Sequence, residues 1–279
     1  MSRTPRRWLI TGVSSGLGAA LAQAVLDHGD AVVGTVRSED AARAFASLSP
    51  AAGGPGRAEP IRLDVTDRDR VFSALEGQTF DVLVNNAGYC LAGAVETLEA
   101  SAFRDQLETN VVGALNMIQA VLPGMRAAGS GRIINIGSLS GVTGMAGLGG
   151  YCASKFALAG LSDTLAAEVS RFGVLVTLVE PGGFRTNFAG RSLKLEGRDI
   201  DDYAEQNAAL VTGFARSHGH QPNDPAKGAR ALIALAEHPQ PPIRFALGHD
   251  ARERIERALA ERIEGYRGTA NLGMDTAFS

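Results

Sequence analysis

The chain has few of the residues that mark a secreted, disulfide-bonded or nucleic-acid-binding protein. Its 279 residues include only two cysteines, Cys90 and Cys152, and two cysteines cannot form a disulfide framework. Basic and acidic residues are interspersed, and the formal net charge is −3. That balance argues against nucleic-acid or polybasic membrane-surface partners. We therefore expect a cytoplasmic protein with free thiols.

A membrane-spanning run and a metal-binding cluster are also missing. The longest stretch without charge, residues 133–154, contains six glycines and several serines, so it would make a poor membrane helix. The apolar run near the N-terminus is too short and too rich in glycine and serine for a signal peptide. No further ligands accompany His218 and His220. We expect no membrane segment and no metal.

What the chain does contain is a regular alternation of short apolar runs with longer helical patterns. The runs are rich in Val, Ile and Leu with little alternation, as in strands buried on both faces. They lie at residues 7–10, 31–36, 60–63, 81–85, 132–136, 175–180 and 243–247. This alternation of strand and helix patterns predicts one α/β domain over residues 1–279. Its sheet is expected to be doubly wound and Rossmann-type, with about seven parallel strands and helices on both faces. Residues 187–223 break the rhythm, and we expect a substrate lid there.

The first predicted strand runs into the sequence TGVSSGLG, which has glycines at positions 12, 16 and 18. A tight glycine turn between a strand and a helix lets backbone N–H groups approach a pyrophosphate, and the helix dipole favours its negative charge. Ser14 and Ser15 add hydroxyl groups to the same turn. The strand before it and the amphipathic helix after it favour a dinucleotide site over a plain turn.

The end of the second predicted strand bears on the choice of coenzyme. An acidic residue there bonds both hydroxyls of the adenosine ribose and rejects a 2′-phosphate. Val36 stands at that place and Arg37 follows it, and a guanidinium suits a phosphate. We therefore favour NADP(H). NAD(H) stays the alternative, because Glu39 and Asp40 lie close to Arg37.

Residues 151–155 read YCASK, in a chain with three lysines among 27 basic residues. On a helix, Tyr151 and Lys155 share a face, since they are four residues apart. A nearby ammonium favours phenolate, so we expect Lys155 to lower the Tyr151 pKa from about 10 toward neutrality. Such a phenol exchanges a proton with an alcohol oxygen. The compact ammonium also reaches ribose hydroxyls more easily than the rigid fork of arginine.

Two further polar residues stand where a ligand would lie. Ser138 ends a predicted strand, and the carboxyl end of a strand faces the ligand crevice of an open α/β sheet. Its hydroxyl would bond the substrate oxygen, although a turn serine is the plainer reading. Asn110 lies inside a predicted helix, where asparagine is unfavourable unless its amide has a partner. We consider a side-chain or water link from Asn110 to Lys155.

Taken together, these motifs resemble the short-chain dehydrogenase/reductase family in its compact one-domain form, and within it the hydroxysteroid and retinol dehydrogenases. The resemblance extends over residues 8–186 and includes NNAG at 85–88 and EPGGFRT at 180–186. It implies NAD(P)-dependent hydride transfer between an alcohol and a carbonyl. By position it makes Tyr151 the acid/base, Lys155 its activator, Ser138 the substrate-orienting group and Asn110 the support of a proton-relay water.

The resemblance, together with the reading of Ser14 and Arg37 above, also assigns the coenzyme contacts. From the phosphates to the nicotinamide they are Gly12, Ser14, Ser15, Gly16, Leu17, Gly18, Arg37, Asp64, Val65, Asn86, Ala87, Gly88, Tyr151, Lys155, Pro181, Gly182, Phe184 and Thr186.

Three functions remain after this reading. The expected one is a carbonyl reductase or alcohol dehydrogenase that acts on an apolar ketone or alcohol, as a homodimer or homotetramer. The second is a regulator that senses the nucleotide without turnover, which the intact Asn–Ser–Tyr–Lys set disfavours. The third is a lyase or epimerase on the same fold, which usually has a longer chain or a different glycine motif.

Overall fold

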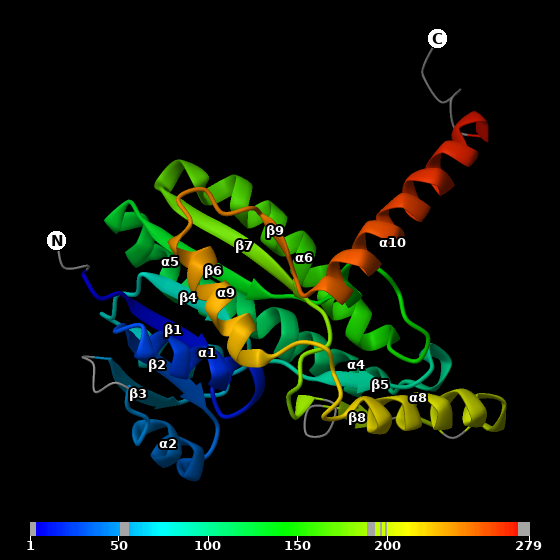
Figure 1. Ribbon diagram of the computed structural model, residues 1–279, viewed down its shortest axis with the longest axis horizontal. Helices are drawn as coiled ribbons and strands as arrows, with labels where there is room; N and C mark the ends of the chain where they lie inside the picture. The colour runs from blue at the N-terminus through cyan, green and yellow to red at the C-terminus, as the bar shows by residue number, and fades with distance from the viewer. Residues whose placement is uncertain (1–3, 51–55, 189–192, 196, 199, 273–279) are drawn as a thin grey trace.

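The computed structural model describes residues 4–50, 56–188, 193–195, 197–198 and 200–272. Seven parallel strands form one sheet in the order β3-β2-β1-β4-β6-β7-β9 (Figure 1). The strands are β1 (Arg7–Thr11), β2 (Ala31–Val36), β3 (Arg57–Arg62), β4 (Val82–Asn85), β6 (Gly131–Ile136), β7 (Val174–Pro181) and β9 (Arg244–Leu247). This order confirms the predicted doubly wound sheet. From β1 the chain first adds strands toward one edge of the sheet, and from β4 onward it adds them toward the other edge. Open α/β sheets bind ligands at such a change in strand order.

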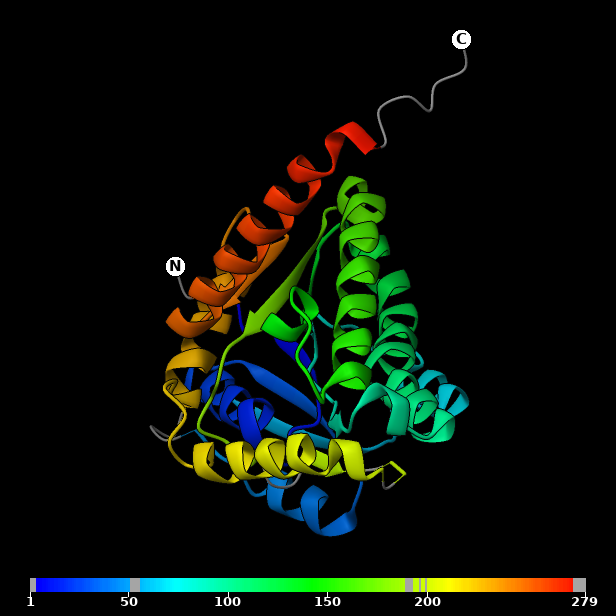
Figure 2. The same cartoon turned by 90° about the vertical axis from the view of Figure 1, so that its right-hand side faces the viewer.

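Helices cover both faces of the sheet, and each face has its own apolar core (Figures 1 and 2). One core is formed with α1 (Gly16–Asp27), α2 (Glu39–Ala46) and α9 (Pro225–Glu237). The other is formed with α3 (Arg68–Leu75), α5 (Gly113–Ala128) and α6 (Gly149–Val169). Trp8 and Leu9, adjacent on β1, are buried in opposite cores. The unbroken apolar runs of the sequence reflect this two-sided burial.

The third strand begins three residues earlier than predicted and includes Pro60, which pairs in register with Gly34. Residues 57–59 form no apolar run, so the sequence predicts the strand only from the proline onward. Pro60 is tolerated because β3 is the edge of the sheet, where the nitrogen side of a proline can stay unpaired.

The predicted lid segment contains structure that the sequence reading does not anticipate. The short strand β8 (Leu193–Leu195) pairs in parallel with β5 (Cys90–Ala92), and a turn at Asp201–Tyr203 leads into α8 (Ala204–Ser217). The Tyr203 hydroxyl donates a 2.7 Å hydrogen bond to Glu96. Positions 189–192, 196 and 199 of the segment lie outside the described residues. That the segment acts as a lid stays a prediction.

The C-terminal helix α10 (His249–Gly268) follows the last strand and extends beyond the body of the molecule (Figures 1 and 2). Of its residues only Ala251 and Ile255 are buried. They pack on Leu139 and Val142, which follow β6. The first half of α10 therefore lies against the loop at the carboxyl end of the sheet.

One described helix, Ala100–Ala128, is long and apolar enough by length and composition to cross a membrane. It comprises α4 (Ala100–Leu107), a π-turn (Glu108–Val112) and α5. Met117, Ile118 and Val121 pack in the core against the sheet. This packing accounts for its apolar composition.

Candidate active site

Tyr151 and Lys155 lie on the first turns of α6, and both side chains are buried. The Lys155 ammonium lies over the Tyr151 ring, with Nζ 5.7 Å from the ring centroid. Nζ also donates a 2.8 Å hydrogen bond to the carbonyl oxygen of Ile136, at the end of β6. The helical spacing of the two residues thus places the phenol and the amine together at the carboxyl edge of the sheet.

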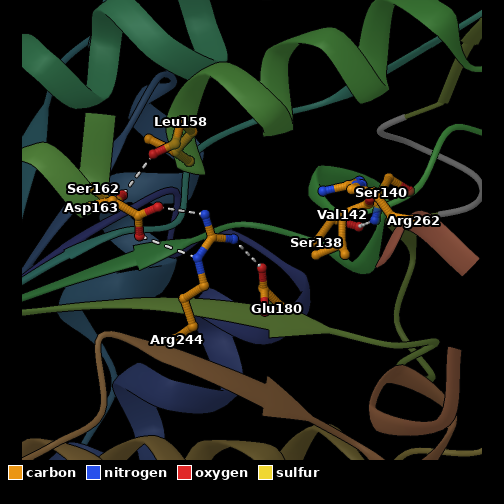
Figure 3. A network of polar contacts seen from close by, with 9 residues as sticks. All are labelled: Ser138, Ser140, Val142, Leu158, Ser162, Asp163, Glu180, Arg244 and Arg262. Atoms are coloured by element: carbon orange, nitrogen blue, oxygen red, sulfur yellow. Dashed lines mark hydrogen bonds and ion pairs between the residues drawn. The ribbon is translucent and has the colours of Figure 1, made fainter. Parts of the chain in front are cut away.

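Ser138 comes directly after β6 and caps a short 3₁₀ turn, η3 (Leu139–Gly141). Its Oγ accepts a 3.1 Å hydrogen bond from the Ser140 amide. Figure 3 shows Ser138, Ser140 and Val142 gathered in this turn. Ser138 lies close enough to the Tyr151 phenol to oppose the rise of its pKa, so the structure places the predicted serine beside the predicted tyrosine.

The pKa of Tyr151 differs from the sequence-based expectation. Burial raises it above the ordinary value of about 10, and the buried thiol of Cys90 adds to the rise, while the hydrogen bond from Ser138 opposes it. Burial also lowers the pKa of Lys155 to about 8. The expected lowering of the Tyr151 pKa is therefore wrong for the chain on its own. The physical reason is that burial disfavours the charged phenolate, and the neighbouring Lys155 does not offset this cost.

Asn110 lies in the π-turn and is 2% exposed. Its Nδ2 donates to the Tyr89 carbonyl and to Ser154 Oγ, both at 3.0 Å, and its Oδ1 accepts from the Tyr89 amide at 3.1 Å. A π-turn is a rare irregularity that is frequent at functional sites. Because the amide is occupied by these bonds, the direct link to Lys155 is not made. A link through water stays a prediction.

The glycine turn has the shape that a pyrophosphate requires. Gly12 and Gly16 have φ angles of +71° and +64°, which residues with a side chain rarely adopt. A Cβ on Gly18 would lie 2.4 Å from Asn86 Nδ2. Within the described chain, Ser15 makes no side-chain cap on the first turn of α1, so these amides stay open to a ligand. The turn therefore fits a dinucleotide.

Replacing Gly18 with alanine tests this close approach. The new Cβ would also lie 2.6 Å from the Gly12 carbonyl oxygen, so the turn or the Asn86 loop must move. We expect the free energy of unfolding to fall by about 1–3 kcal/mol and NADPH binding to weaken. Thermal unfolding and a fluorescence titration with NADPH measure both effects.

Gly124→Ala in α5 is the matched control, because a Cβ there meets no atom within 4 Å. Alanine is the better helix former by roughly 0.5–1 kcal/mol, so this control should be neutral or stabilising. Equal effects of the two substitutions would contradict the assigned role of the turn.

Asn86, Ala87 and Gly88 follow β4 and are held against the glycine turn. Thr11 Oγ1 accepts from the amides of Asn86 and Ala87, both at 2.9 Å, while Asn86 Nδ2 donates to the Thr11 carbonyl at 2.8 Å. The sequence reading misses Thr11, although it directly precedes Gly12. A hydroxyl at the end of a strand is the signal that identifies it.

A hollow of about 490 Å³ lies at the β2–β3 edge of the sheet. Its lining residues are Arg37, Arg62, Leu63, Asp64, Asp67 and Arg70. Glu39 lies within 4 Å of both Arg43 and Arg62, and Asp40 pairs with Arg43. Within the described residues Arg37 makes no ion pair, so the two acids that weakened the NADP(H) prediction have other partners.

Of four further predicted coenzyme contacts, Asp64 lines this hollow. Its Oδ1 accepts from the amide and the hydroxyl of Thr66, at 3.0 and 2.8 Å. Ser14 is exposed, and Val65 is buried with its carbonyl accepting a 3.0 Å bond from Asn116. Leu17 packs at the margin of the α1–α9 core. The coenzyme contacts of these four residues stay predictions.

The segment after β7 closes the crevice on the opposite side. The Gly182 amide donates a 3.0 Å bond to the Leu247 carbonyl, next to Pro181 at the end of β7. Thr186 lies near Gly16, 3.8 Å from where a Cβ on that glycine would stand. The Phe184 ring turns away, into the core against Gly228. The coenzyme contact predicted for Phe184 stays a prediction, and its ring packs away from the glycine turn.

Behind this segment, Glu180 is buried and pairs with Arg244 Nη1 at 2.9 Å. Arg244 also bonds Asp163 on α6 through Nε and Nη2, at 3.2 and 2.6 Å (Figure 3). This network joins β7, β9 and α6, so it fixes the strand from which the segment starts.

Tyr151 belongs to a small apolar cluster. Its other members are Cys90, Ala92, Met145, Leu148, Cys152, Leu193, Leu210 and Phe214. Outside this cluster, Phe188 lies with its ring centroid 6.0 Å from that of Tyr151. Both cysteines are free and buried. No group of three or more His, Cys, Asp or Glu side chains suited to a metal occurs among the residues that the structure describes.

Comparisons with known proteins agree with this geometry. The family model of the short chain dehydrogenases matches residues 6–196. A 3-ketodihydrosphingosine reductase of Bacteroides thetaiotaomicron is 37% identical over 88% of this chain and 88% of its own length. The human 17-beta-hydroxysteroid dehydrogenase type 1 is 41% identical over 66% of this chain and 58% of its own length.

A solved structure of a short-chain dehydrogenase from Streptomyces avermitilis is 37% identical in sequence. It superimposes with a TM-score of 0.87 and covers 99% of this chain and 100% of its own. Both the family match and this superposition span the glycine turn, the serine turn and the Tyr–Lys pair.

Proposed function

The chain belongs to the short-chain dehydrogenase/reductase family of oxidoreductases, and on that premise we propose that it is an NADP(H)-dependent carbonyl reductase. The observation that carries the proposal is that the Lys155 ammonium lies over the Tyr151 ring, and that Ser138 stands beside this pair at the end of β6. When bound, NADPH supplies the hydride that reduces the carbonyl carbon of the substrate.

The side chains of the site take complementary parts in this reaction. Tyr151 gives its proton to the carbonyl oxygen as that oxygen gains charge, and Ser138 donates a hydrogen bond to the same oxygen. The resulting alkoxide becomes an alcohol, and the tyrosine recovers its proton from solvent. Lys155 stabilises the transient phenolate, and its ammonium would hold a ribose hydroxyl of the coenzyme. Asn110 keeps the Tyr89 loop and Ser154 in place under the site.

Burial raises the pKa of Tyr151, so the phenol carries its proton near neutral pH. A protonated phenol is the form that donates a proton to a carbonyl oxygen, as reduction of a ketone requires. Reduction is therefore the direction in which the proposal is tested.

The pH dependence of reduction follows from Lys155, whose folded pKa is about 8. Below this pH the ammonium is charged, and above it the charge is lost. We expect kcat/KM for reduction to be flat from pH 6 to 7 and to fall up to tenfold per pH unit above about 8. The Lys155→Arg variant keeps its charge, so its kcat/KM should be lower overall but should no longer fall above about pH 8. If kcat/KM of this variant still fell above pH 8, the fall could not be assigned to Lys155.

The coenzyme proposal rests on the charge at the β2–β3 edge. Arg37, Arg62 and Arg70 line the hollow there, and Val36 stands where a ribose-binding acid would exclude a 2′-phosphate. NADPH is therefore the proposed coenzyme, with NADH as a weaker one.

The substrate proposal rests on the apolar cluster around Tyr151. Two relatives carry the names of enzymes acting on a sphingoid ketone and on a steroid, both apolar. We infer a bulky apolar ketone. The direct test is NADPH oxidation, followed by its absorbance, with a panel of steroid, aromatic and long-chain ketones against small polar ones. Turnover of only the polar ketones would overturn the inference.

A nucleotide-sensing regulator stays the second candidate, and it predicts NADPH binding without turnover across the whole panel. The buried serine, tyrosine and lysine support an enzyme instead, because a sensor has no need of them. We further propose that the protein works in the cytoplasm as a homodimer or homotetramer.

A further inference from the structure

Asp250 lies in the first turn of α10, far in sequence from the motifs of the site. Its Oδ2 accepts a 2.7 Å hydrogen bond from the Gly183 amide, in the segment that follows β7. Its Oδ1 accepts a 2.7 Å hydrogen bond from Asn223 Nδ2. Acids in the first turn of a helix often serve only the helix itself. Here both carboxylate oxygens bond groups outside α10.

Asn223 completes a clamp on the same segment. Its Nδ2 and its backbone amide donate to the Gly183 carbonyl at 2.9 and 3.1 Å, and its own carbonyl accepts from Arg185 at 2.9 Å. The fit leaves no room for larger residues, since a Cβ on Gly182 would lie 2.3 Å from the Asp250 carboxylate. Residues 182–185 are therefore fixed by groups from two later parts of the chain.

Arg262, three turns further along α10, holds the serine turn in a similar way. Its Nη2 donates to the carbonyl oxygen of Val142 (Figure 3). Its guanidinium also lies 5.9 Å from the centroid of the Phe156 ring. On the other side the turn abuts α6, because a Cβ on Gly141 would lie 2.9 Å from the Lys155 carbonyl oxygen. The turn that starts at Ser138 thus lies between α6 and α10.

We propose that α10 positions both sides of the active site: Asp250 with Asn223 sets the nicotinamide segment 182–186, and Arg262 sets the turn that carries Ser138. The proposal rests on the proposed function for its catalytic meaning. Asp250, Asn223 and Arg262 are positioning residues, and none of them is proposed to touch the substrate. The two ends of one helix should therefore affect different kinetic constants.

The first test uses the protein without coenzyme or substrate. Hydrogen exchange followed by mass spectrometry should show faster exchange in segment 182–188 for Asp250→Ala, by about tenfold or more, and no change in 138–145. Arg262→Met should give the opposite pattern. The controls are Glu261→Ala and Arg257→Met, exposed residues of the same helix. Because this readout needs no turnover, it stands even if the protein proves to have no reductase activity.

The second test separates the two roles in function. Asp250→Ala should raise the Kd for NADPH, measured by its fluorescence, by about 10- to 100-fold, and Asp250→Asn by less. Arg262→Met should leave that Kd unchanged but lower kcat for the ketone by about tenfold, with partial recovery in Arg262→Lys. If an alanine or methionine variant fails to fold, the Asn and Lys variants carry the same comparison.

The two tests distinguish failure of the positioning proposal from failure of the proposed function. Opposite exchange patterns with separate effects on Kd and kcat support the proposal. Equal changes in both segments for either variant, or changes no larger than those of the controls, overturn it. The expected exchange patterns together with absent turnover would overturn the proposed function and leave the positioning of the two segments standing.

Discussion

Tyr151→Phe is expected to lower kcat for ketone reduction by about 10²- to 10⁴-fold, because phenylalanine keeps the ring but has no proton to donate. The ring would still pack against Phe188 and under Lys155, so the fold and the Kd for NADPH should hardly change. Steady-state NADPH oxidation with the best ketone of the panel gives kcat. A fluorescence titration gives the coenzyme Kd of the same preparation.

The control is Tyr266→Phe, which removes a hydroxyl from a side chain that is 72% exposed on α10. This variant should have the activity of the parent protein. Full activity in Tyr151→Phe would remove the tyrosine from the chemistry. A loss of both kcat and NADPH binding would indicate instead that the phenol is needed to build the site.

Arg37→Asp should reverse the coenzyme preference. A hydrogen bond to a charged group is worth about 1.5–3 kcal/mol, so loss of the contact to the 2′-phosphate alone predicts a fall of about 10- to 150-fold in kcat/KM for NADPH. The new carboxylate can bond the free ribose hydroxyls of NADH, which moves the ratio further in the same direction. The ratio of kcat/KM for the two coenzymes is the measurement.

Arg230→Asp provides the same change of charge at an exposed site on α9 that does not line the hollow. It should leave the ratio unchanged, apart from a small long-range effect that salt screens. If Arg37→Asp shifts the ratio of kcat/KM for the two coenzymes no more than this control does, then Arg37 does not contact the 2′-phosphate. In that case Arg62 and Arg70 become the residues to replace.

The local signals in the sequence predicted most of the sheet. Strands such as β2 and β6 are buried on both faces, so each is a short apolar run that needs no partner to be recognised. The early start of β3 is not predicted, because Arg57, Ala58 and Glu59 form no apolar run and join the strand only by pairing with β2. Strand β8 was missed because three residues in a charged segment carry no periodic signal.

In the candidate site, too, some features follow from the local sequence and others do not. The approach of Lys155 to Tyr151 follows from helical spacing, and the positive φ angles of Gly12 and Gly16 follow from residue type. The pKa of Tyr151 does not follow from spacing. Burial and the thiol of Cys90, 61 residues away in the chain, reverse the shift expected from the lysine alone.

By itself, then, the sequence determined the buried strands, the glycine turn and the placement of Lys155 beside Tyr151, because each depends on residues within a few positions of one another. Only the tertiary structure decided that burial raises the pKa of Tyr151, that Phe184 packs against the core, and that Asp250 and Asn223 clamp Gly183. Desolvation and long-range hydrogen bonds depend on which distant segments meet. No local pattern of residues records that.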